Sequence, residues 1–288
     1  EAPTAIDSLP PPPLQPGLTL PWPDLLRVAD TIDDLLADPR VPFERRIRRV
    51  LTFAKLAQPV RPLALAGGVR PVMQVLAAAA IDDTPEHPEA LSPPSWVGRM
   101  LFRQAAAIYI RKDHGPDAGI ARTSKWARIR AAWRFAIGKG SVPALHAKIP
   151  ATSFATAEQP HPALEPVIIQ LLTRYYRVKI QSLQFCGRPN FGLPFWDGLA
   201  SFLLTYPLLM WLNRVLAANP AWDPLSRMTQ AIRMIDENFG YNPLLGTARQ
   251  AWAVRILRDR GELERLSAWY SRENPVGIRE PQEQASAR

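Results

Sequence analysis

Apolar residues recur every three or four positions along most of this chain, which is the spacing of an amphipathic α-helix. The first such segment begins at Asp24 and ends at Asp38-Pro39, and its apolar face is formed by Leu25, Val28, Ala29, Ile32, Leu35 and Leu36. Pro42 fits the first turn of a second helix, whose buried stripe is formed by Phe43, Ile47, Val50, Leu51 and Ala54. Together the two segments predict an antiparallel helical hairpin, a usual opening of an all-α domain.

The same spacing returns in most of the remaining chain. It predicts further helices over residues 71–80, 95–111, 122–137, 164–185, 195–217, 223–237, 244–260 and 262–270. No window alternates between apolar and polar residues in the manner of a half-buried strand, so no sheet is expected. The pattern therefore predicts an all-α fold, an irregular array of about eight or more helices.

Proline and glycine set the expected boundaries of the domain. Residues 1–23 are rich in proline and lack a periodic apolar face, so they predict an extended, polyproline-like arm. Residues 24–271 form the expected helical domain, and residues 272–288 a polar tail. Because residues 138–162 have the composition of a linker or surface loop, a division of the domain into two lobes, 24–137 and 163–271, stays open.

The most apolar window covers residues 198–212 and lies between Asp197 and the pair Asn213-Arg214. It is shorter than the ~18–20 residues that a membrane-spanning helix needs. We therefore expect a buried core helix, kinked or started at Pro207, and no transmembrane span.

Charge and cysteine content narrow the class of protein. Lys and Arg outnumber Asp and Glu by 35 to 26, a net charge of +9, which favours anionic partners such as nucleic acid, acidic proteins or lipid headgroups. The single cysteine, Cys186, excludes an internal disulfide framework and fits a reducing compartment, so we expect a cytoplasmic protein. The scattered histidines have no metal-ligand spacing, and we expect solvated loop residues and no metal site; they are His87, His114, His146 and His161.

Motifs that would indicate an enzyme are missing from the sequence. There is no dinucleotide-binding GxGxxG, no phosphate-binding GxxxxGK[ST] and no GxSxG of a hydrolase. The segment 138–141 resembles a phosphate loop only in its glycines. Adjacent carboxylates such as Asp33-Asp34 point about 100° apart on a helix and do not form an acid–base pair by themselves. We assign no catalytic residue, and we expect no cofactor within this chain.

Two basic helical segments are the candidates for binding an anion or a partner. The first contributes Arg45, Arg48 and Arg49, and the second contributes Lys125, Arg128, Arg130 and Arg134. The second also carries Trp126 and Trp133, as a helix does when it lies on a membrane surface or stacks against bases. Its apolar stripe nevertheless has core spacing, so we favour a helix that buries Trp126, Ile129, Trp133 and Ile137 and exposes its arginines to water.

A turn rich in residues that tolerate unusual backbone angles separates the helices at 223–237 and 244–260. Its candidate site residues are Asn238, Phe239, Gly240 and Tyr241. We expect a helix terminus here, with the rim of a pocket as the alternative.

Three stretches resemble flagellin-lysine N-methylase-type proteins, which carry a cysteine-cluster region followed by a helical portion. They are VPFERRI at 41–47 within the hairpin 24–57, the segment 175–217, and IDENFGYNPLLG at 235–246. The resemblance implies the helical portion of a longer protein, or a relative without the cluster, because Cys186 is the only cysteine. It would bring S-adenosylmethionine as cofactor, and it transfers no catalytic residue to this chain.

Three functions follow from the sequence. We favour a helical interaction module or accessory subunit of a larger assembly, without chemistry of its own, because catalytic motifs are missing. The alternative is a protein-lysine N-methyltransferase or its substrate-recognition portion. The third is a protein that binds nucleic acid or an anionic membrane surface through its basic helices, with an affinity that falls steeply with salt.

Overall fold

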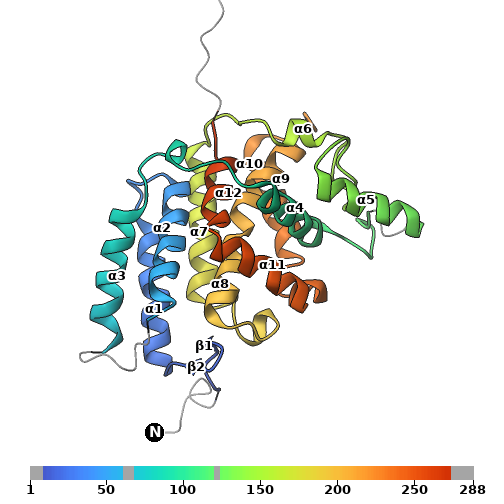
Figure 1. Cartoon of the computed structure of the whole chain (residues 1–288). Coiled ribbons are helices and arrows are strands. Elements are labelled where there is room, and N and C mark those ends of the chain that lie inside the picture. Colours follow the sequence, from blue (N-terminus) through green and yellow to red (C-terminus); the bar gives the residue numbers. More distant parts are fainter. Residues whose placement is uncertain (1–8, 61–67, 120–123, 274–288) are drawn as a thin grey trace, which may run out of the picture.

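The computed structural model describes residues 9–60, 68–119 and 124–273 of the chain, and these residues form an all-α fold, as the sequence predicts. Helices α2, α6, α10, α11 and α12 pack on the central pair α8 and α9 (Figure 1). The helices are α1 Trp22–Ala37, α2 Phe43–Ala57, α3 Val69–Asp83, α4 Trp96–Ile110, α5 Lys125–Ile137, α6 Phe154–Ala157, α7 Pro166–Gln181, α8 Phe195–Leu203, α9 Thr205–Leu216, α10 Pro224–Asp236, α11 Ala248–Asp259 and α12 Glu262–Tyr270. Short 3-10 turns lie at Pro88–Ala90, Arg188–Asn190 and Pro243–Gly246.

The described part of the N-terminal arm is a small hairpin that packs on the domain. Strands β1 Pro13–Gln15 and β2 Leu18–Thr19 pair antiparallel, and β1 contacts α8. Leu14 and Leu20 are buried in the core. The expectation that the chain has no sheet is therefore wrong here. Strands this short lack the length to show alternation, and the nearby prolines, which have no N–H, limit how far the pairing can extend.

The central helices confirm the expected buried core helix. Every residue of α8 and α9 is buried, and the helices meet at Leu204. Pro207 lies in the first turn of α9, where it interrupts the run of backbone hydrogen bonds between the two helices. The stretch Phe195–Leu216 is long and apolar enough to cross a membrane by length and composition alone, but in this fold other parts of the chain cover all of it.

Helices from the first and second parts of the chain share one core. Helix α1 packs on α7, α2 on α12, and α4 on α11. Asp33 of α1 accepts two hydrogen bonds of 2.8 Å from Arg177 of α7. The expected linker at 138–162 also contributes buried side chains, including Leu145 and Phe154, and its short helix α6 packs on α9. One hydrophobic cluster therefore contains residues of both ranges proposed as lobes.

Candidate functional site

The first group of candidate arginines lies on α2, and most of it is inside the protein. Arg48 is buried, pairs with Glu44, and donates through Nη1 to the carbonyl oxygen of Pro85 at 2.8 Å. Arg49 is also buried, and burial lowers its pKa. Arg45 lies 3.4 Å from the Glu86 carboxylate.

The arginine-rich side of α2 is covered because this helix contacts α1, α3, α8 and α12. The spacing of residues along α2 does not show these neighbours. Burial raises the pKa of the Glu44 carboxyl, although the guanidinium of Arg48 works in the opposite direction. Arg48 and Arg49 thus lie inside the protein, where the neighbouring helices cover them.

The second basic segment, α5, has its tryptophans on the outside. Trp126 is 79% exposed, Ile129 59% and Trp133 64%. The prediction that these side chains form the buried face is wrong. We call Trp126, Ile129 and Trp133 the α5 stripe.

The sequence offers α5 two apolar faces, and the fold uses the smaller one. At about 100° per residue, Ala131 and Phe135 lie on the side opposite the α5 stripe. These two are the buried residues of the helix, which packs against α4 at the edge of the molecule, away from α1 and α3 (Figure 1). Periodicity predicts the larger apolar face as the core face, because spacing alone cannot distinguish two such faces.

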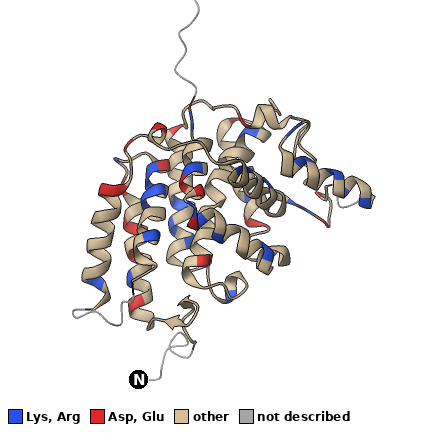
Figure 2. Cartoon of the chain, viewed as in Figure 1, with Lys and Arg blue, Asp and Glu red and all other residues tan. Residues whose placement is uncertain are grey.

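The cations of α5 lie beside the stripe. By helical position, Lys125 flanks it on one side and Arg130 on the other. Figure 2 shows Lys and Arg along this helix, which contains no acidic residue. Arg134 donates to Ser141 Oγ at 2.9 Å, and among the described residues no carboxylate pairs with Lys125, Arg128, Arg130 or Arg134. The structure thus leaves this cationic group open to an outside partner.

An open groove of about 920 Å³ runs beside the stripe. One wall is α5, with Trp126, Arg130 and Trp133, and the other is the loop 141–144 with Val142 and Pro143. The groove therefore combines an apolar wall with a guanidinium, on the side of α5 that the core does not use.

The turn after α10 is a structural helix terminus, as the first of the two expectations had it. Asn238 is buried and donates through Nδ2 to the carbonyl oxygen of Met234 at 3.2 Å. Phe239 is buried and stacks on Tyr109, and Gly240 has φ +80°. Tyr241 points outward and is 81% exposed.

Two of the four histidines and the cysteine are buried inside the protein. His146 and His161 are buried, and burial lowers both pKa values, so the expectation of solvated loop histidines is wrong for these two. Burial raises the pKa of the Cys186 thiol to about 12, so its thiolate is scarce at neutral pH. Across residues 9–60, 68–119 and 124–273, no group of three or more His, Cys, Asp or Glu side chains is placed to hold a metal ion.

No family model, no curated protein and no solved structure matches this chain.

Proposed function

We propose that the protein is a helical interaction module that docks onto a protein partner through the α5 stripe. The observation that carries the proposal is the exposure of Trp126, Ile129 and Trp133 between Lys125 and Arg130. Trp and Arg are the residues that most often dominate the binding energy of protein interfaces. A soluble protein gains nothing in folding from leaving two tryptophans in water, so their exposure supports a binding role.

The chemistry of the surface favours an acidic amphipathic helix as the occupant. The α5 helix has 13 residues, which is about 20 Å of helix. A partner helix that lies along it would place apolar residues against the stripe and Asp or Glu opposite Lys125 and Arg130. Recognition of this kind, a helix in an apolar groove, selects residues at helical spacing.

The groove beside α5 is the reason to favour a protein over an anionic membrane or nucleic acid. A side chain or helix turn from a partner can enter the space between α5 and the loop 141–144. A flat lipid surface cannot follow that concave shape. Trp126 and Trp133 lie on one wall of the groove. A partner that fills the groove therefore buries apolar surface, which contributes roughly 25 cal/mol of binding free energy per Å² before the costs of association.

Site-specific photo-crosslinking in the source cells tests this proposal. A photoreactive amino acid replaces Trp133 in one variant, and in a matched control it replaces Val75 of α3, which is also exposed. We expect position 133 to crosslink one protein species through an acidic, amphipathic segment. A synthetic peptide of that segment should bind the purified chain, and Trp126→Ala should weaken the binding about tenfold or more.

The outcomes separate the three binding classes. Crosslinks from position 133 to lipid or nucleic acid, or no crosslink above the Val75 control, would overturn the proposal. Urea unfolding checks that the binding variants remain folded. Trp126→Ala should change the free energy of unfolding by less than about 0.5 kcal/mol, because Trp126 is exposed. The comparison variant Trp211→Ala should lose about 3–5 kcal/mol, because Trp211 is buried.

The protein-lysine N-methyltransferase alternative, with S-adenosylmethionine as its cofactor, stays a prediction from the sequence resemblance. The described residues give no observation that favours it.

A further inference from the structure

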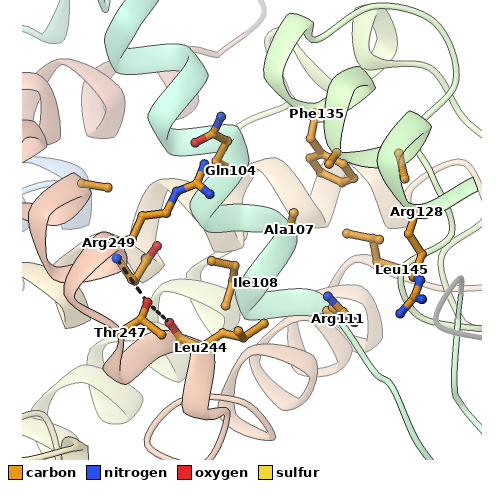
Figure 3. A pocket seen from close by; sticks show the side chains of 14 residues that line it. Gln104, Ala107, Ile108, Arg111, Arg128, Phe135, Leu145, Leu244, Thr247 and Arg249 are labelled. Atoms are coloured by element: carbon orange, nitrogen blue, oxygen red, sulfur yellow. Dashed lines mark hydrogen bonds between the residues drawn. The ribbon is translucent and has the colours of Figure 1, made fainter. Parts of the chain in front are cut away.

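A second cavity lies on the other side of α5, away from the stripe. It has a volume of about 460 Å³ and opens to solvent between α4, α5 and α11. Figure 3 shows Ala107 and Ile108 of α4 between the walls, with Phe135 on one side and Thr247 on the other. Cavities of this size hold small molecules.

The lining of this cavity is apolar in the middle and cationic at its ends. Ile108, Ala131, Phe135, Leu145 and Ala253 supply carbon surface. The charged residues of the lining are three arginines and no carboxylate: Arg111, Arg128 and Arg249.

The arginines occupy two different places. In Figure 3, Arg111 and Arg128 lie toward one end, and Arg249 lies beside Gln104 toward the other. Arg111 uses its Nε to bond Asp113, while Arg128 is exposed and pairs with no carboxylate in the part of the chain that the structure describes. Both arginines line the cavity, and a guanidinium can bind a carboxylate through two parallel N–H donors.

The wall that α11 contributes holds a further unused polar group. Gln250 is 5% exposed, and its buried Nε2 has no hydrogen-bond partner among the described residues. Gln250 lines the cavity, and an unsatisfied buried donor is costly, so an acceptor placed within reach of its amide would lower that cost.

We propose that this cavity binds a small anionic amphiphile, a carboxylate carried on an apolar chain. The carboxylate lies between Arg111 and Arg128, and the chain extends over Ile108 toward Phe135 and Ala253. The stripe residues lie on the opposite face of α5, so this ligand site and the partner-binding surface can be tested independently.

Calorimetric titration of the whole chain with decanoate tests the site, and decanol is the neutral control ligand. We expect decanoate to bind with one-to-one stoichiometry. Decanol should bind at least about tenfold more weakly, because its hydroxyl carries no charge to pair with the guanidiniums. Arg128→Gln should weaken decanoate binding about tenfold or more. Its matched control is Arg130→Gln, which removes the same charge from the same helix on the stripe side and should change the affinity less than about twofold.

A second variant tests the apolar part of the site. Ala107→Phe places a ring on the floor of the cavity and should abolish decanoate binding while Arg111 and Arg128 remain. Helical circular dichroism confirms that each variant is folded. Equal binding of decanoate and decanol, equal effects of Arg128→Gln and Arg130→Gln, or full binding by Ala107→Phe would each overturn the proposal.

Discussion

One buried carboxylate in this protein is held by two arginines. Asp197, in the first turn of the buried helix α8, accepts from Arg255 at 3.0 and 2.6 Å and from Arg258 at 2.7 Å. Both arginines come from α11, so a single carboxylate fastens that helix to the centre of the fold. A buried charge that loses its partner is far more costly than an exposed one, because water cannot replace the lost contact.

Replacement of Asp197 by alanine should therefore destabilise the protein by about 3–5 kcal/mol, since it leaves the partly buried Arg258 without its main partner. Urea unfolding followed by circular dichroism measures this free energy. The matched control is Asp259→Ala, because exposed Asp259 also pairs with Arg258, at 2.8 Å. That change should cost less than about 1 kcal/mol. Equal losses in the two variants would contradict the role given to Asp197.

At the scale of elements, connections decide how closely helices approach. The turn after α10 brings Gly240 against the 3-10 turn Arg188–Asn190, and a Cβ at Gly240 would lie 2.6 Å from the carbonyl oxygen of Pro189. Gly240 also has a positive φ of 80°. The position excludes other residues for two separate reasons, backbone strain and contact with a neighbouring backbone.

Gly240→Ala should cost about 2–4 kcal/mol, the sum of left-handed strain and a backbone clash. Gly192 provides the control, because its φ is +73° but a Cβ added there would have no neighbouring atom within 4 Å. Gly192→Ala should cost only the strain, about 1 kcal/mol. Thermal and urea unfolding of both variants compare the two values. A Gly240 variant no less stable than the Gly192 variant would show that the turn can move away from Pro189.

At the scale of the whole molecule, contacts between the two halves of the chain predict cooperative unfolding. Asp33 joins α1 to α7 through Arg177 and through Gln181, which donates at 3.0 Å. The buried helices α8 and α9 contribute to the same core as α1 and α2. Loss of either half would expose the apolar surface of the other to water.

We therefore expect α1 and α9 to become exposed in one transition. Hydrogen exchange with mass spectrometry, across a urea series, should show both helices opening with the same free energy. Helix α5, which buries only Ala131 and Phe135, should open at lower urea. An earlier, separate transition of residues 24–137 would instead support two lobes, 24–137 and 163–271.

The sequence by itself determined that this chain is helical and where most helices run, because the three-to-four-residue spacing of apolar side chains is a local property. It also predicted a buried helix kinked or started at Pro207, and the turn at Gly240. The sequence pattern does not predict the four-residue helix α6 or the two short strands, because elements of that length contain too few residues to show a period.

Only the tertiary structure decided which face of each helix meets the core. The α2 arginines resemble a solvated face in sequence, yet neighbouring helices on several sides bury Arg48 and Arg49. On α5 the reverse holds: Ala131 and Phe135 fit against the body, and the two tryptophans remain outside. Periodicity gives the angle between side chains around one helix, whereas burial depends on neighbours distant in the sequence. The two candidate sites flanking α5 arise from that packing.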